Sequence, residues 1–354
     1  MTWELNCSRS NCCKPCFAQT ESVHIPSKHM DYTSRQQPPS TTTPPRSRMG
    51  ELDFLKCVFI LLMITFHLVY IGDTHPWAKQ VVYTFHMPGF LIISGYLTNT
   101  AKQPKAFLRS LLWIAVPYAV MESGYVVMAS LLPIREHIDQ LTPMVFLDHL
   151  VLHPLGPYWY LHTLVLCQAV VYSVAHLPRL SPTTRMLLAG LLFYGLAAGC
   201  HVVSLPCALY FLGGVVVRQG GLRFTDFFKA SPLALVVFAV LVAYGANLDK
   251  ATAGGVLIVY SVISFCLWTY RILPHAVRRP LLFIGRNTLP LFLFSPMFTI
   301  VCKGFLPYVL FDPSGSVYLA LSLPLCVVCS LVVAHLLELT RLAPLMFGKA
   351  KIIT

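Results

Sequence analysis

Long apolar segments recur between residues 54 and 337 and limit the folds that this chain can adopt. They are about 16 to 25 residues long, close to what an α-helix needs to cross roughly 30 Å of hydrocarbon. The chain is 56% hydrophobic and 11% charged, against roughly 25% charged in soluble domains. The sequence therefore predicts an all-α, polytopic membrane protein with about ten transmembrane helices. The predicted spans are 54–71, 81–99, 109–132, 158–176, 186–201, 203–217, 232–247, 253–270, 281–301 and 317–337.

Positive charges alternate between the two ends of these spans. With the N-terminus in the cytoplasm, most Arg and Lys residues fall on the cytoplasmic side, as the positive-inside rule requires. We therefore expect a multi-pass protein of the cell (cytoplasmic) membrane with both termini cytoplasmic and the lipid bilayer as a partner. The net charge of +12 then reflects topology, so no nucleic-acid partner is expected. The opposite side holds Lys79, Arg135, Lys250 and Lys303.

The segment 1–48 differs from the rest because it is rich in Pro, Ser and Thr and poor in apolar residues. Such a composition predicts a disordered tail before a membrane domain at 49–354. Met49 is an alternative start of translation. The tail carries Cys7, Cys12, Cys13 and Cys16, whose thiolates would suit zinc. A second paired cluster or a histidine motif is missing, so we expect no metal.

Ionisable residues interrupt the first two apolar spans at Asp53, Lys56, His67 and His86. An ionisable group in a membrane is unfavourable and is by default a functional hypothesis. Lys56 and His67 are eleven residues apart, which places them on one helix face about 16 Å apart along the axis. A cation near the cytoplasmic end and an imidazole deeper in the membrane suit an anionic substrate from the cytosol. The alternatives are a snorkelling lysine and a hydrogen-bonded structural histidine.

Ile60 and Met63 fall close to the same stripe of the first span as Lys56 and His67. The following spans carry polar residues whose predicted depth in the membrane is similar to that of His67. These are His86, Glu122, Tyr158, Trp159 and His162.

Three histidines and a carboxylate are thus expected to line one outer cavity, although the sequence does not determine which helices are neighbours. A neutral imidazole suits removal of a proton from an alcohol. A three-histidine metal site is the alternative. It is disfavoured because no two of these histidines have the i, i+4 spacing of a preformed helical site.

Small residues in SGY at 94–96, and in Gly195-x-x-x-Gly199, are expected to let helices approach closely.

Four motifs occur in order after Met49. They are LDFLK followed by His67, FHMPGFLIISGY with Ser94, GPYWYLHTLVL, and GRNTLPLFLFS with Arg286 and Asn287. They resemble those of the acyltransferase-3 family of integral membrane O-acyltransferases, which includes bacterial enzymes that acetylate sugar hydroxyls. One departure is Ser295, which stands where the family usually has histidine.

The resemblance implies transfer of an acyl group, acetyl by preference, from cytosolic acetyl-CoA to a hydroxyl of an extracytoplasmic or lipid-linked glycan. His67 would be the general base or acyl-relaying residue, and Lys56, beside Asp53, would hold the CoA or orient the site. A glycan or another hydroxyl-bearing small molecule is the expected partner. The candidate substrate-binding residues are His86, Ser94, Glu122, Tyr158, Trp159, His162, Arg286 and Asn287.

Two other classes remain open. A secondary transporter or exporter would use buried His and Glu as a proton relay, but no second copy of the first two motifs suggests repeated halves. A non-catalytic membrane sensor would retain the scaffold, and Ser295 keeps this alternative open. The acceptor and the oligomeric state do not follow from the sequence.

Overall fold

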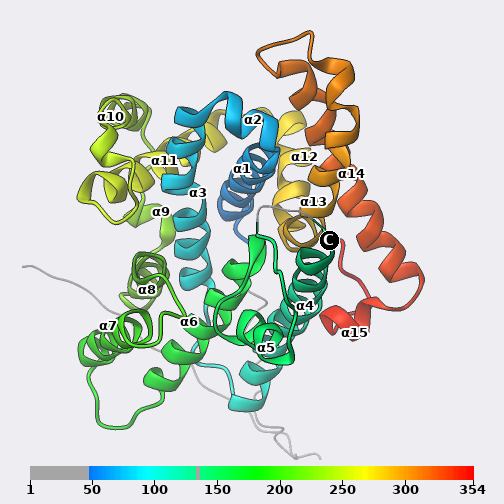
Figure 1. Ribbon diagram of the computed structural model, residues 1–354. Coiled ribbons are helices and arrows are strands. Elements are labelled where there is room, and N and C mark those ends of the chain that lie inside the picture. The colour runs from blue at the N-terminus through cyan, green and yellow to red at the C-terminus, as the bar shows by residue number, and fades with distance from the viewer. Residues whose placement is uncertain (1–47, 133–135) are drawn as a thin grey trace, which may run out of the picture. The chain divides into compact units, whose positions relative to one another are not determined.

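Helices make up all the regular structure that the computed structural model describes, over residues 48–132 and 136–354 (Figure 1). The predicted all-α class is confirmed for these residues, and Arg48–Thr354 form one compact unit. The predicted tail up to residue 47 and its four cysteines lie outside the described residues. The helices are α1 Gly50–His67, α2 Val69–Thr74, α3 Pro76–Leu97, α4 Pro104–Leu131, α5 Pro143–Val151, η1 Gly156–Tyr158, α6 Trp159–Ala175, α7 Pro182–Ala198, α8 Leu205–Gln219, α9 Phe224–Phe227, α10 Leu233–Val242, η2 Gly245–Asn247, α11 Ala253–Ile272, α12 His275–Arg286, α13 Thr288–Cys302, η3 Lys303–Val309, α14 Ser316–Leu339 and α15 Ala343–Phe347.

Four helical segments within the described ranges are long and apolar enough to cross a membrane. Each of the ten predicted spans overlaps a helix, but ten crossings stay a prediction. The predicted span 232–247 is α-helical only over the ten residues of α10, about 15 Å at 1.5 Å per residue. The four segments are Pro104–Leu131, Ala253–Ile272, Thr288–Val309 and Ser316–Leu339.

Two predicted spans are interrupted in the structure. The first ends its helix at His67, because Leu68 has extended backbone before α2 begins. The predicted span 281–301 is broken at Asn287, between α12 and α13. Both interruptions fall on or beside candidate site residues, so His67 and Asn287 lie at helix ends rather than within continuous helices.

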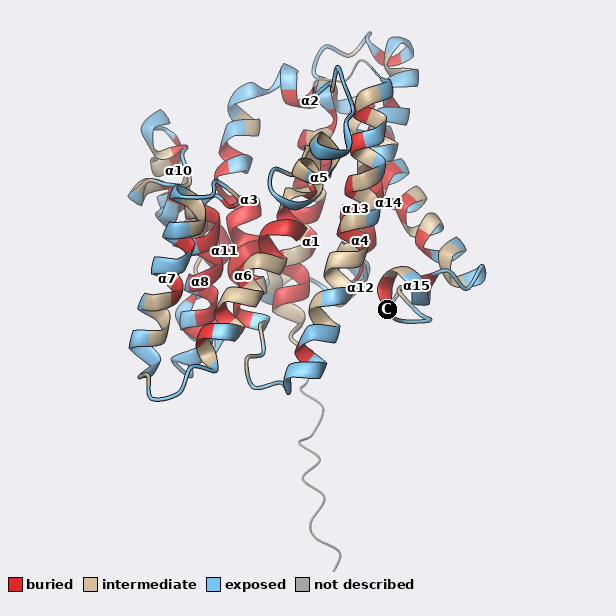
Figure 2. Ribbon diagram, turned by 60° about the horizontal axis from the view of Figure 1, so that its bottom comes forward, coloured by how far each residue is buried: buried red, intermediate tan, exposed pale blue. Residues whose placement is uncertain are grey.

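Apolar side chains remain exposed on the outer helices. Leu187 of α7 is 70% exposed, Val236 of α10 is 61% exposed and Val328 of α14 is 56% exposed. Large exposed apolar surfaces mark contact with lipid or with another protein, and here they fit the apolar character of the spans. Figure 2 shows that buried residues are concentrated instead on α1, α3 and α11.

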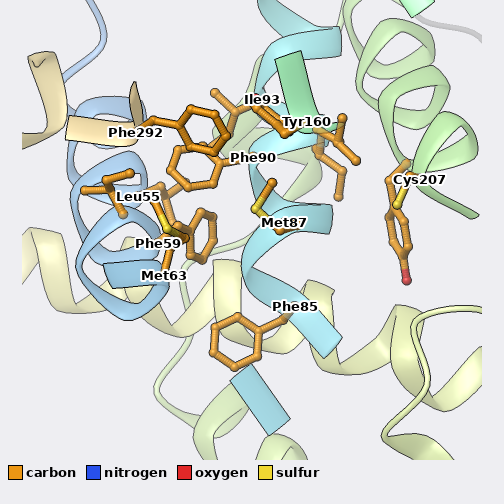
Figure 3. Packing of buried hydrophobic residues seen from close by; sticks show 14 of the residues in the cluster. Leu55, Phe59, Met63, Phe85, Met87, Phe90, Ile93, Tyr160, Cys207 and Phe292 are labelled. Carbon is orange, nitrogen blue, oxygen red and sulfur yellow. The ribbon is translucent and has the colours of Figure 1, made fainter. Parts of the chain in front are cut away.

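The helix α1 lies between α3 on one side and the pair α12 and α13 on the other (Figure 1). The helix packs mainly against α12, α3 and α13, and Figure 3 shows Leu55, Phe59 and Met63 of α1 within the apolar core. The rings of Phe59 and Phe90 are 5.7 Å apart, and those of Tyr160 and Phe292 are 5.4 Å apart. This aromatic core fixes the helix that carries Lys56 and His67.

Glycines bring α3 and α8 into close contact. A methyl group on Gly95 would overlap the carbonyl oxygen of Phe211, and one on Gly214 would overlap that of Ile92. The expectation for SGY at 94–96 is therefore confirmed. The expectation for Gly195 is wrong, because none of the described atoms beyond its own helix and chain neighbours lies within 4 Å of a side chain added there.

Candidate active site

The predicted stripe on α1 lines two adjacent cavities. Lys56 and Ile60 line the first, of about 220 Å³, which we call the middle cavity. Met63 and His67 line the second, of about 190 Å³, which we call the histidine cavity. Both cavities include Phe292 in their walls, so they are neighbours along the helix.

The histidine cavity brings together two of the three predicted histidines. In each of them Nδ1–H donates to a carbonyl one turn earlier, from His67 to Met63 and from His86 to Val82, at 2.7 Å in both cases. This bond leaves Nε2 as the nitrogen that carries the lone pair of the neutral ring. Each imidazole is thus set up as a proton acceptor. The other walls are Tyr83, Met87, Pro157, Trp159 and Lys250.

Tyr83 connects the two imidazoles within this cavity. Its ring centroid lies 6.3 Å from that of His67 and 5.2 Å from that of His86. The tyrosine hydroxyl donates to the carbonyl of Phe66 at 3.3 Å, which ties α3 to the C-terminal turn of α1. The two histidines, which come from different helices, thus both lie near one aromatic ring.

A buried carboxylate stands at the other end of α1. The side chain of Asp53 is 3% exposed, and its oxygens lie 2.8 Å from Arg48, 2.7 Å from Lys56 and 3.6 Å from Arg286. A buried charge is tolerated when it is paired in this way. Gly285 of α12 packs directly against the carbonyl oxygen of Asp53. The LDFLK motif therefore joins α1 to α12 and leaves more positive than negative charge at this end.

Four cations line a larger cavity at this end, of about 600 Å³, which we call the basic cavity. None of its described lining side chains is acidic, and Ser110 and Trp113 add polar and aromatic surface. Guanidinium groups suit phosphate because their N–H donors match its oxygens. The basic cavity shares Ile114 and Leu289 with the middle cavity. Its cations are Arg48, Arg109, Arg286 and Lys349.

The middle cavity lies between the other two, because it shares Ile114 and Leu289 with the basic cavity and Phe292 with the histidine cavity. It is lined mainly by apolar side chains, with Lys56 and Ser94 among the polar ones. The hydroxyl oxygens of Ser94 and Tyr160 lie 2.8 Å apart, so these two groups hydrogen-bond to each other across α3 and α6. A small, mostly apolar cavity of this kind suits an uncharged segment of a substrate better than a charged group.

Glu122 and His162 do not join His67 and His86 in one cavity, contrary to expectation. Glu122 Oε1 accepts the N–H of Leu155 at 2.6 Å, and His162 Nε2 donates to the carbonyl of Val151 at 2.8 Å. Both side chains thus support the segment between α5 and α6. That segment carries Pro157 and Trp159 to the wall of the histidine cavity.

Tyr158 also has a structural contact in place of the predicted substrate contact. Its hydroxyl donates to the carbonyl of Leu293 at 3.0 Å, and the side chain is 2% exposed. The neighbouring Trp159 lines the histidine cavity together with His67 and His86, and its role in substrate binding stays a prediction. Ser295 is 1% exposed within α13 and is not part of the walls of the three cavities.

Asn287 positions the last residues of the chain beside the basic cavity. Its Nδ2 donates to the carbonyls of Phe283 at 2.8 Å and Thr354 at 3.2 Å, and its Oδ1 accepts the N–H of Thr354 at 2.9 Å. Glu338 accepts N–H groups of Ile352 and Ile353. Ile352 and Thr354 are walls of the basic cavity, so Asn287 shapes that cavity through them.

Several wall residues were not singled out from the sequence. Arg48, Arg109 and Lys349 count there only as positive-inside charges, and Lys250 only as a lysine of the outer side. Tyr160 carries no signal beyond its place in GPYWYLH. Arg109 gave no separate signal, because a basic residue at the predicted cytoplasmic end of a span is usually an anchor.

A family model described as an acyltransferase domain matches residues 49–335. Searches of the curated proteins and of the solved structures give no match. The matched range contains α1, His67, His86, the ion pairs of Asp53 with Lys56 and Arg286, and all residues of the histidine and middle cavities. It also agrees with the motifs that begin at LDFLK. The chain therefore belongs to the acyltransferase-3 family of integral membrane acyltransferases.

Proposed function

We propose that this membrane acyltransferase moves an acetyl group from cytosolic acetyl-CoA to a hydroxyl of an extracytoplasmic or lipid-linked glycan. One observation carries the proposal. Three adjacent cavities follow α1, from a group of four cations to a pair of imidazoles. A substrate with a polyanionic head, a linear arm and a reactive end would match that order of surfaces.

The donor substrate fits the basic cavity by charge. Arg109 and Lys349 lie in its walls without an ion pair among the described residues, and Arg48 and Arg286 share the carboxylate of Asp53. Charge-assisted bonds from guanidinium to phosphate are among the stronger polar contacts in proteins. The phosphates of CoA would lie here, and the pantetheine arm would follow the middle cavity past Lys56 and Ser94.

The transfer step needs a base at the acceptor hydroxyl, and His67 is the proposed base. The hydroxyl proton passes to His67 Nε2 as the hydroxyl oxygen attacks the carbonyl carbon of the thioester. The carbon–sulfur bond breaks, an ester bond remains on the acceptor, and the CoA thiolate takes the proton from the imidazolium. His67 ends the cycle neutral, with Nδ1 still bonded to the carbonyl of Met63.

His86 and Trp159 would surround the acceptor hydroxyl in this scheme, since both line the same cavity as His67. Lys56 and Asp53 would act at the other end, where they hold α1 and the donor in register. The base would thus lie at the outer end of α1, and the positioning residues would lie at its cytoplasmic end.

The test uses the full chain in lipid nanodiscs or in host membranes with labelled acetyl-CoA. His67→Asn should lower the rate of acetyl transfer about 100-fold or more, since general bases contribute roughly that much. The matched control is His149→Asn, at a half-buried histidine of α5 whose hydrogen bond among the described residues is to the carbonyl of His153. Binding of acetyl-CoA should be unchanged in both. A His67→Asn protein that transfers acetyl groups at the wild-type rate would exclude His67 as the base.

The acceptor class is tested separately by mass spectrometry of surface glycans. Cells without the gene, complemented with wild type or with His67→Asn, are compared. An acetyl-sized mass that is present only with wild type supports a glycan acceptor. Acetyl transfer to a product that contains no sugar would contradict it.

A further inference from the structure

Lys250 lines three cavities at once. One is the histidine cavity. A second is a polar cavity of about 560 Å³ with Asp73, Gln80 and Asp249 in its walls, which we call the outer cavity. The third is an apolar groove of about 490 Å³ between α8, α9 and α11, which we call the apolar groove. The cationic side chain of Lys250 thus lies where the apolar groove, the outer cavity and the histidine cavity meet.

The apolar groove is long enough to hold one hydrocarbon chain. Leu205, Leu209, Gly213 and Val217 of α8 line it at four-residue intervals, which places them along one face of the helix. From Leu205 to Val217 this face is about 18 Å long at 1.5 Å per residue. At Gly213 an added side chain would meet no atom within 4 Å among the described residues beyond its own helix and chain neighbours. The groove is therefore open at its middle.

The two ends of the groove differ in chemistry. At one end Phe227 and Phe228 form its wall, and Tyr260 donates a hydrogen bond to the carbonyl of Phe227 at 3.0 Å. At the other end lies Lys250, whose backbone carbonyl accepts the hydroxyl of Tyr210 at 2.8 Å. The groove thus runs from an aromatic, apolar end to a cationic end, which is the polarity of an anionic amphiphile.

The charge of Lys250 is available to a ligand. Over residues 48–132 and 136–354 no carboxylate forms an ion pair with it, and its Nζ lies 5.9 Å from the ring centroid of Trp159. Asp249 beside it accepts the N–H of Ala251 at 2.9 Å. Trp159 is itself a wall of the histidine cavity, so the ammonium group faces the place where the acceptor hydroxyl would react.

The outer cavity suits a hydroxylated headgroup. Carboxylate and amide side chains such as Asp73, Gln80 and Asp249 can accept and donate hydrogen bonds to several hydroxyls. The cavity shares Tyr83 as well as Lys250 with the histidine cavity. A headgroup in the outer cavity can therefore place one hydroxyl next to His67 and His86.

We infer that the acceptor is an anionic, hydroxylated lipid whose hydrocarbon chain lies in the apolar groove, whose phosphate pairs with Lys250 and whose sugar headgroup lies in the outer cavity. The inference rests on the proposed function and adds the chemical class of the acceptor. It selects the lipid-linked form of the glycan over a soluble or polymeric one. The transfer step is unchanged, with the attacking hydroxyl supplied by the lipid headgroup.

The test follows the first product of acetylation in host membranes that contain the natural acceptor. Membranes with wild type or with His67→Asn receive a short pulse of labelled acetyl-CoA and are then extracted with organic solvent. Label that depends on His67 should appear first in the organic phase, on a phosphate-containing lipid. Label that appears first in water-soluble or polymeric glycan would overturn the inference and leave the proposed function intact. The absence of any label that depends on His67 would overturn both.

Two groups of variants test the groove and the cation. Gly213→Leu fills the open middle of the groove and should lower organic-phase labelling about tenfold or more, since one extra methylene in an apolar pocket has effects of that order. Gly195→Leu is the matched control, because Gly195 is also a helical glycine with no described atom within 4 Å beyond its own helix and chain neighbours. Lys250→Gln should lower labelling as well. Lys250→Arg keeps the positive charge and should be labelled like wild type. Equal labelling in Gly213→Leu and Gly195→Leu would mean that the groove holds only bulk membrane lipid.

Discussion

The carboxylate of Asp53 lies 2.7 Å from the Nζ of Lys56, three residues further along α1. The same carboxylate lies 3.6 Å from Arg286, the second residue of the GRNTLPLF segment, more than 200 residues later in the chain. Two of the four motifs are therefore joined at one buried charge. The pairing fixes the N-terminal end of α1, from which its stripe runs towards His67.

Gly285→Ala should weaken this junction. The added methyl group would overlap the carbonyl oxygen of Asp53, and a backbone atom cannot move aside as a side chain can. Overpacking of this kind typically costs about 1–3 kcal/mol. We expect a lower midpoint of thermal unfolding in detergent and a lower transfer rate. Gly304→Ala is the control, since nothing described lies within 4 Å of the added methyl group beyond chain neighbours and its own helix. Equal midpoints for the two variants would contradict the close packing of α12 on α1.

Arg109→Gln should raise the KM for acetyl-CoA about tenfold and leave kcat nearly unchanged. The reason is that Arg109 lines the basic cavity, where it would bind donor phosphate equally in the ground and transition states. Loss of a hydrogen bond to a charged group is worth roughly 1.5–3 kcal/mol, which corresponds to at least a tenfold change in affinity.

The control for Arg109→Gln is Arg279→Gln, at an exposed arginine outside the basic cavity. The KM of wild type should also rise with salt, because salt screens the attraction between the cavity and the donor. If the two variants have the same KM, phosphate binding in the basic cavity is excluded.

The stripe on α1 could be predicted from sequence because it is local. The spacing of Lys56 and His67 fixes their relative direction within one helix, and the cavities confirm that both residues, with Ile60 and Met63, face the same series of spaces. The all-α class was also predictable, since apolar runs of membrane length admit few other folds.

Contacts between distant helices were not predictable in the same way. His162 and His86 have similar predicted depths, but depth does not determine rotation about the helix axis, and His162 turns towards the carbonyl of Val151 instead. Arg109 and Lys250 were assigned to topology because the positive-inside rule explains a basic residue without reference to its neighbours. Only the folded structure places Arg109 in the wall of the basic cavity and Lys250 in the wall of the histidine cavity.

Substitutions of Glu122 distinguish an acyltransferase from a transporter with a proton relay. Its Oε1 accepts the N–H of Leu155 at 2.6 Å, and the side-chain carbonyl oxygen of a glutamine can accept the same N–H. Glu122→Gln should therefore retain most of the transfer activity, whereas Glu122→Ala should lower both the activity and the thermal midpoint, because the segment that carries Trp159 loses its support. A relay would instead need the titrating carboxyl group. A Glu122→Gln protein that is stable but inactive would contradict the structural role.

The ten-span topology is tested at the turn between α13 and α14, where Tyr308 is 80% exposed. In a Cys200→Ser background, which removes an exposed native thiol, Tyr308→Cys should react with a membrane-impermeant thiol reagent added to intact cells. Arg271→Cys, at an exposed position on the predicted cytoplasmic side, should react only after permeabilisation.

The labelling pattern also determines which side of the membrane each cavity faces. If Tyr308→Cys is labelled from outside, the end of α1 that carries His67 faces the extracytoplasmic side and the basic cavity faces the cytosol, so the acetyl group must travel along α1 across much of the membrane. The reverse labelling would place the basic cavity outside the cell. Cytosolic acetyl-CoA could not reach it there, and a donor on the other side of the membrane would have to be sought.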